Sequence, residues 1–242
     1  MLRVIGRRVV DVPPAEYGAL CEPYRGVLLD IGTGDGKHVL HLARRRPEWL
    51  VIGVDAAADR MRKASTRAAA NPARGGLRNA MFVVAAAERL PAELTGAAEI
   101  HVLMPWGSLL RGMIGGDQQM LARIAAAGRP GADFLVTLNL HAWQPRVSEV
   151  GDVPEPDPEW AMSQLALGYR QAGWFMERAA YLDDTEIAEL ATSWTKRLGA
   201  SRSQLDVLSL TGTLRADAAA GGSAVDLADG TPVMAPAHQI DG

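Results

Sequence analysis

The stretch VLLDIGTGDGK, residues 27–37, decides the fold of this chain. It begins as an apolar run that predicts a buried strand, passes through Asp30, and ends in glycines at alternate positions of residues 32–36. A second apolar run, residues 50–54, follows and ends in Asp55. A strand, a glycine turn, a helix, a strand and an acid in this order are typical of a nucleotide-type cofactor site on a doubly wound sheet.

The composition is that of one large domain in a reducing compartment. The chain has 242 residues, of which 48% are hydrophobic, and this is enough for one substantial core. Its single cysteine, Cys21, excludes an internal disulfide and a cysteine-rich metal site. No apolar run reaches the roughly 18 residues that span a bilayer, and the N-terminus lacks the features of a signal peptide. We therefore expect a cytoplasmic protein without a membrane partner.

Charge is distributed unevenly along the chain. The net charge is −3, yet residues 1–80 hold 14 Lys and Arg against 8 Asp and Glu, whereas residues 81–242 hold 11 against 20. A basic half on a near-neutral protein can present a face that binds phosphates. Solvated surface charge in an arginine-rich protein gives the same pattern, so charge alone leaves both interpretations open.

The periodicity predicts an α/β fold with a seven-stranded, mostly parallel sheet, an antiparallel final strand and an N-terminal β-hairpin. The strands are expected at residues 27–31, 50–54, 81–85, 100–104, 133–140, 174–181 and 204–214, with helices at 14–17, 36–46, 57–70, 117–127, about 160–172 and 185–190. The expected domain covers residues 1–215, with the hairpin at 1–12 and insertions at 144–172 and 183–203. Residues 216–242 lack periodicity and are expected to form a disordered tail.

The glycine loop and the two acids favour S-adenosylmethionine (SAM) over other nucleotide cofactors. The loop is not a P-loop, because Lys37 is followed by His38, and its third glycine comes one residue early for a dinucleotide fingerprint. Asp30 would repel a pyrophosphate but suits a sulfonium or an α-amino group, and Asp55 can accept both hydroxyls of a ribose. NAD remains the alternative.

Two further segments follow the third and fourth predicted strands, at the edge where open α/β sheets bind ligands. Glu88 is expected beside the adenine of the cofactor, and it can also stabilise a helix N-terminus. The segment Met104-Pro105-Trp106 starts without an acid or an amide, which many amino-methyltransferases carry there. A ring nitrogen of adenine is already an unprotonated nucleophile, so a stacking tryptophan without a base suits it; a core role for Trp106 is the alternative.

A third segment, residues 191–197, surrounds Trp194 with hydroxyl groups and with the cations of Lys196 and Arg197, and Arg202 follows. This composition indicates a loop that stacks a base and binds phosphates. An amphipathic helix with Trp194 inward is the alternative reading. His38 and His41 have the spacing of neighbours on one helix face, but no third ligand lies nearby, so no metal site is expected.

Together, LLDIGTGDGKH, AERLP, HVLMPWGSLLRG, LNLHAW and TSWTKRL resemble the aminoglycoside-resistance 16S ribosomal RNA methyltransferases that modify adenine 1408 at ring nitrogen 1. The resemblance is strongest to the enzymes of aminoglycoside-producing actinomycetes and covers roughly residues 1–215. It implies a Rossmann-like class I methyltransferase that uses SAM, acts on the 30S subunit, binds no DNA and is a monomer. Its alternatives are a transfer-RNA guanine-N7 enzyme, a small-molecule methyltransferase and a non-catalytic RNA-binding protein.

The resemblance also implies roles for individual residues. The cofactor is expected to contact Asp30, Gly32, Gly34, His38, Asp55, Ala87, Glu88, Met104, Pro105, Thr192 and Ser193. Trp106 and Trp194 would sandwich the flipped adenine, with Ser108 beside it. The RNA would contact Lys196, Arg197 and Arg202, and also Arg7, Arg8, Lys63 and Arg67 on the hairpin and the 57–70 helix.

Overall fold

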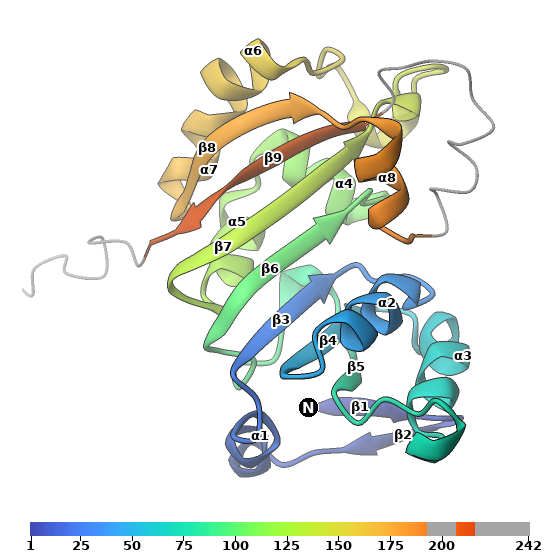
Figure 1. The fold of residues 1–242 in the computed structure, drawn as a ribbon. Coiled ribbons are helices and arrows are strands. Elements are labelled where there is room, and N and C mark those ends of the chain that lie inside the picture. The colour runs from blue at the N-terminus through green and yellow to red at the C-terminus, as the bar shows by residue number, and fades with distance from the viewer. Residues whose placement is uncertain (193–206, 216–242) are drawn as a thin grey trace, which may run out of the picture.

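A nine-stranded sheet forms the centre of the molecule, with helices on both faces (Figure 1). The computed structural model describes residues 1–192 and 207–215. The strand order is β2-β1-β5-β4-β3-β6-β7-β9-β8. The strands are β1 (Leu2–Ile5), β2 (Arg8–Asp11), β3 (Gly26–Ile31), β4 (Trp49–Asp55), β5 (Ala80–Val84), β6 (Ala97–Leu103), β7 (Gly128–Asn139), β8 (Trp174–Tyr181) and β9 (Val207–Leu214).

The middle of the sheet is parallel, as the sequence predicts. Strand β3 pairs in parallel with β4 on one side and with β6 on the other, and β5 and β7 continue the parallel arrangement outward. The final strand, β9, lies antiparallel between β7 and β8. The expected seven-stranded, mostly parallel sheet with an antiparallel final strand is therefore confirmed.

The N-terminal hairpin is part of the same sheet. Strand β1 pairs antiparallel with both β2 and β5, so the hairpin extends the β5 edge. Ser65, on the helix that covers this edge, fixes the hairpin from one face: its hydroxyl donates to the carbonyl of Val4 at 2.8 Å and accepts from the N–H of Gly6 at 2.9 Å. The hairpin is thus bonded both along the sheet and to a helix.

The helices divide between the two faces of the sheet. Helices α2 (Lys37–Arg45), α3 (Ala58–Ala68) and α8 (Asp184–Glu189) cover one face, where Leu28, Val39 and Met61 are buried together. The other face packs against α1 (Pro14–Cys21), α4 (Gly107–Gly115), α5 (Gln118–Ala125) and α7 (Ala166–Gln171). A short α6 (Pro158–Trp160) and a π-helical turn (Ala161–Leu165) precede α7.

Three expectations differ from the structure. Helix α4 was not expected, because glycines at positions 107, 112 and 115 weaken the helical pattern; it forms because Leu109, Leu110 and Met113 bury their side chains against the sheet. Strand β7 begins at Gly128 rather than 133. The expected helix at 160–172 contains the π-turn.

Within the described residues, no helix is long and apolar enough to cross a membrane.

Candidate cofactor site

A cavity of about 530 Å³ opens at the carboxyl ends of β3, β4, β5 and β6, a size suited to a nucleoside-sized ligand. The parallel strands all end at this edge, so the loops that follow them meet there. The cavity is lined by Asp30, Gly32, Thr33, Gly34, Asp35, His38, Asp55, Ala56, Arg60, Ala85, Ala86, Ala87, Glu88, Leu103, Met104, Pro105, Trp106, Ser108, Leu109 and Thr192.

The glycine turn after β3 is bonded directly to the acid at the end of β4. The N–H of Gly34 donates to Asp55 Oδ2 at 2.9 Å, and the N–H of Ala57 donates to Oδ1 at 2.8 Å. Both carboxylate oxygens of Asp55 are therefore fixed by the backbone while each retains a lone pair for a ligand. Gly36 has a φ of +69°, and a Cβ at this position would meet the ring of Phe82 at 2.5 Å, so α2 can begin here only with glycine.

Asp30 is the most deeply buried acid of the site, with 2% of its surface exposed. Burial raises the pKa of its carboxyl to about 6, while the hydrogen bond from Thr33 and the charge of His101 oppose the rise. The hydroxyl of Thr33 donates to Asp30 Oδ2 at 2.6 Å. A cationic ligand group beside Asp30 would hold this carboxyl in its ionised form.

The end of β5 supplies a small, apolar wall. Ala85, Ala86 and Ala87 line the cavity, and Glu88 follows in a 3₁₀ turn that spans Ala87–Arg89. The small side chains of these three alanines leave room for a flat ring. Glu88 is exposed at the rim and lies in the first turn of the short helix, so both readings of this acid are compatible with its position.

The end of β6 forms the opposite wall. Met104 has a φ of +46°, a left-handed conformation that is rare for a residue with a side chain. Its backbone N–H is held by the carbonyl oxygen and the hydroxyl of Thr137, at 2.9 and 3.1 Å. This bend turns Pro105 and the half-buried Trp106 toward the cavity, and α4 begins directly after them.

Thr192 closes the cavity from the far end of the chain. Its hydroxyl lies 3.8 Å from the sulfur of Met104, so the residues that follow α8 contact the β6 loop at the cavity. The preceding residue, Ala191, is left-handed like Met104, with a φ of +50°. Among the described residues, these are the two non-glycine positions with positive φ.

The charges of the cavity favour a cationic ligand, and its hydrogen-bond acceptors favour one that carries a diol. Among the described residues, four carboxyl groups line the cavity, those of Asp30, Asp35, Asp55 and Glu88, against the single guanidinium of Arg60. Such a lining repels phosphates and attracts a sulfonium or ammonium group. The two fixed oxygens of Asp55 suit paired ribose hydroxyls, and the alanine wall suits an adenine. The residues present therefore fit SAM and do not fit the pyrophosphate of NAD.

The structure brings together most of the residues predicted for the site. Asp30, Gly32, Gly34, His38, Asp55, Ala87, Glu88, Met104, Pro105 and Thr192 line the cavity, as do Trp106 and Ser108. Ser193, Trp194, Lys196, Arg197 and Arg202 lie outside the described residues. Arg7, Arg8, Lys63 and Arg67 are exposed on the hairpin and on α3, away from the cavity.

Sequence reasoning missed several lining residues. Thr33 and Asp35 alternate with the loop glycines, and their place within the loop could have predicted that they line the cavity. Arg60 faces the cavity from the first turn of α3, and Leu109 reaches it from α4, a helix that was not expected. Arg60 carries no pattern that separates it from the other arginines in the basic half of the chain.

Comparison with known proteins gives one consistent result. The family model described as 16S rRNA (adenine(1408)-N(1))-methyltransferase matches residues 2–213. A protein of that name from Streptoalloteichus tenebrarius is 54% identical over 214 residues, which are 88% of this chain and 99% of the relative. One from Escherichia coli is 29% identical over 84% of this chain and 94% of its own length.

Solved structures agree with these relatives. The crystal structure of the 16S rRNA methyltransferase KamB covers 89% of this chain and all of its own, with a TM-score of 0.86 and 53% identity. A tryptophan-to-alanine mutant of the Catenulisporales acidiphilia 16S rRNA (adenine(1408)-N(1))-methyltransferase, solved with cosubstrate SAM, covers 89% of this chain and 97% of its own, with a TM-score of 0.81 and 34% identity.

The fold and the cavity define a class I methyltransferase. Within that class, the chain belongs to the 16S rRNA (adenine(1408)-N(1))-methyltransferase family.

Proposed function

We propose that this chain methylates ring nitrogen 1 of adenine 1408 of 16S rRNA in the assembled 30S subunit, with SAM as the methyl donor, and thereby confers aminoglycoside resistance. Family membership supports the reaction and the cofactor. The loop after β6 supports a ring nitrogen as the target. Trp106 faces the cavity there, and neither Met104 nor Pro105 can act as a base.

When bound, SAM supplies an electrophilic methyl group on a sulfonium. The protein contributes position rather than proton transfer. Asp30 would hold a cationic group of SAM and Asp55 its ribose hydroxyls, since both acids line the cavity. Nitrogen 1 of adenine carries a free lone pair at neutral pH, so it attacks without losing a proton, and the methylated base becomes a cation.

The target base is proposed to leave its helix and to stack between Trp106 and Trp194. Flipping a base costs a few kcal/mol. Stacking on an aromatic ring returns about 1–3 kcal/mol per base, so two indoles can offset that cost. Indole faces also attract the positive charge that develops on the base during methyl transfer. Ser108, exposed beside Trp106 at the start of α4, is placed to contact the base or the cofactor.

RNA docking is proposed on the hairpin and α3, where Arg7, Arg8, Lys63 and Arg67 are exposed. Ser65 holds these two elements together, so their cations form one face. Lys196, Arg197 and Arg202 are proposed to grip phosphates nearer the target base. The protein would act as a cytoplasmic monomer, and residues 1–215 would carry the whole activity, in line with a family match that ends at residue 213.

Aminoglycosides are polycations that contact adenine 1408. A methyl group on nitrogen 1 blocks part of the pairing edge and adds a positive charge, so it opposes these drugs both sterically and electrostatically.

Primer extension on purified 30S subunits, incubated with this protein and labelled SAM, tests the proposal. A methyl on the pairing edge stops reverse transcriptase, so we expect a stop at adenine 1408 together with label in 16S rRNA. Label in transfer RNA or in a small molecule, without that stop, would support the other methyltransferases instead. A protein that binds 30S subunits but not SAM would be a non-catalytic RNA-binding protein.

A further inference from the structure

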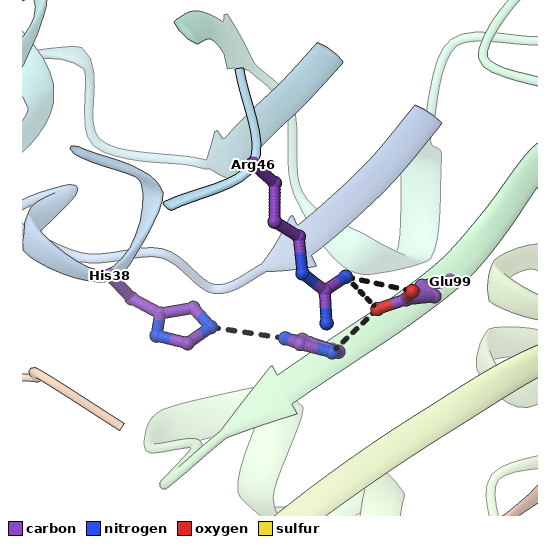
Figure 2. Close-up of polar contacts among 4 residues, drawn as sticks. His38, Arg46 and Glu99 are labelled. Carbon is purple, nitrogen blue, oxygen red and sulfur yellow. Dashed lines mark hydrogen bonds and ion pairs between the residues drawn. The ribbon is translucent and has the colours of Figure 1, made fainter. Parts of the chain in front are cut away.

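A chain of polar groups, two buried histidines and a partly buried ion pair, lies between α2 and β6 (Figure 2). His38 Nε2 is 3.0 Å from His101 Nδ1, and His101 Nε2 is 3.6 Å from Glu99 Oε2. Arg46, which directly follows α2, ends the chain, since its Nη1 donates to both oxygens of Glu99 at 2.8 and 2.7 Å. His38 faces the cavity at one end, and Arg46 and Glu99 lie outside its lining.

The cavity end of this chain continues into the backbone of α8. His38 Nδ1 bonds the carbonyl oxygen of Leu190, the residue that directly follows α8. A carbonyl oxygen only accepts hydrogen bonds, so His38 must carry its proton on Nδ1. Burial, followed by the charge of His101, lowers the pKa of His38 to about 3, so this ring is neutral and its Nε2 is an acceptor.

The bond to Leu190 fixes the direction of the hydrogen bond between the two rings. Since the neutral ring of His38 donates from Nδ1, its Nε2 accepts, and Nδ1 of His101 must supply the proton that the two imidazoles share.

Charged groups lie near His101 on its own strand and on neighbouring elements. Glu99 comes two residues earlier on β6, and Asp30 pairs with His101 across β3 and β6. Burial raises the pKa of Glu99, but the bonds from His101 and Arg46 outweigh it and leave the pKa below its usual value. The remaining neighbours, Arg46 and His38, lie on the α2 side.

The hydrogen bond to the carbonyl of Leu190 matters because the next two residues lead to the cavity. Ala191 follows it in a left-handed conformation, and Thr192 then contacts Met104 and lines the cavity. An alanine with positive φ is strained, and this conformation persists only where its surroundings fix it. The bond from His38 on one side and the contact with Met104 on the other supply that restraint.

We propose that His101 is a positioning residue for methyl transfer: its Nδ1 donates to His38, which orients His38 to donate to Leu190 and so seats Ala191 and Thr192 on the cofactor cavity. This rests on the proposed function, because the segment that begins at Ala191 carries Trp194. Glu99 lies beside the other ring nitrogen of His101 and is itself held by Arg46.

The direct test is nitrogen NMR of the protein labelled with ¹⁵N-histidine, without cofactor or RNA, near neutral pH. We expect His38 to show a protonated Nδ1 with an unprotonated Nε2, and His101 to show a protonated Nδ1. A His38 protonated on Nε2, or a His101 without a proton on Nδ1, would overturn the proposal.

Two substitutions at His101 test the consequence for the reaction. An asparagine amide can replace Nδ1 as a donor to His38, whereas leucine cannot. We expect His101→Leu to lower kcat about tenfold with the KM for 30S subunits changed less than about threefold, and His101→Asn to recover most of that loss. Equal losses in both variants, or a loss confined to KM, would contradict a positioning role.

The two proposals can fail separately. If the parent protein does not methylate 30S subunits, the proposed function fails, yet the NMR spectra still decide the tautomer of His38. If methylation occurs but His38 is protonated on Nε2, only the positioning role fails.

Discussion

The backbone N–H of Gly34 and Oδ2 of Asp55 are joined by a hydrogen bond of 2.9 Å that links the turn after β3 to the end of β4. The bond spans 21 positions of the sequence and ties the two halves of the cofactor site together before any ligand binds. The turn and Asp55, the acid proposed to bind the ribose, are therefore parts of one preorganised unit.

Alanine substitutions at two glycines of this turn should differ in how much stability they cost. Gly36→Ala places a methyl group against Phe82 at a position with positive φ, and we expect a loss of about 3 kcal/mol in unfolding free energy. Gly34 also has positive φ, but a Cβ there meets nothing within 4 Å, so Gly34→Ala should cost only about 1 kcal/mol. Urea unfolding measures both. Equal losses would contradict the packing argument at Gly36.

Asp30→Asn should stabilise the ligand-free protein. In the unfolded chain this carboxyl ionises near pH 3.9, whereas burial raises its folded pKa to about 6. The folded state thus loses stability as pH rises between these values, and asparagine avoids the loss. We expect a gain of about 3 kcal/mol at pH 8 and about half of that at pH 5, measured by urea unfolding.

The same Asp30→Asn substitution should weaken SAM binding at pH 8, because the sulfonium or amino group loses its counter-charge. Calorimetry on the same samples gives this affinity. A variant that is no more stable than the parent at pH 8, or that binds SAM equally well, would show that Asp30 is not a buried carboxylate reserved for a cation.

Trp106→Ala should reduce methylation of 30S subunits by roughly 10- to 100-fold, the equivalent of one lost stacking interaction. SAM affinity should change little, because the indole is proposed to hold the target base. Trp106→Phe retains an aromatic face and serves as the matched control. Calorimetry that shows SAM affinity falling in parallel with activity would reassign Trp106 to the cofactor. We expect the same pattern for Trp194→Ala.

Binding to 30S subunits should weaken as salt rises, and the basic face should account for part of that dependence. Arg67→Gln on α3 removes one proposed phosphate contact, so the slope of log affinity against log salt should fall by about 0.7–0.9. Arg123→Gln is the control, because Arg123 is equally exposed but lies on α5, on the opposite face of the sheet. Filter binding at several salt concentrations measures both slopes, and equal slopes would move the docking face elsewhere.

The parallel sheet and the cofactor acids could be predicted because they depend on local patterns. Apolar runs such as residues 27–31 mark buried strands, and an acid at the end of each of two adjacent parallel strands must point to the same edge. Helix α4 could not be predicted, since its glycines oppose helix formation and only burial of Leu109, Leu110 and Met113 reverses this.

The histidine chain shows a second limit of sequence reasoning. His38 and His101 are 63 positions apart, and their contact depends on the register that sets Asp30 opposite His101. No residue-level pattern gives the register between strands that are not consecutive in sequence. The hydrogen-bond partners of these two histidines could therefore come only from the fold.

The N-terminal hairpin is a hydrogen-bonded part of the sheet and not a separate arm. Four inter-strand steps separate β2 from β3, which at about 4.8 Å per step is roughly 19 Å. Since the steps are hydrogen-bonded and Ser65 locks the last of them, this offset cannot stretch or shorten. On the proposed docking, this fixed offset sets the distance between the phosphates that the hairpin contacts and the extruded adenine in the cavity. An RNA binds productively only when its phosphates and its adenine lie at that distance. The folded shape of the ribosomal subunit, and not the nucleotide sequence around the adenine, would then select the target.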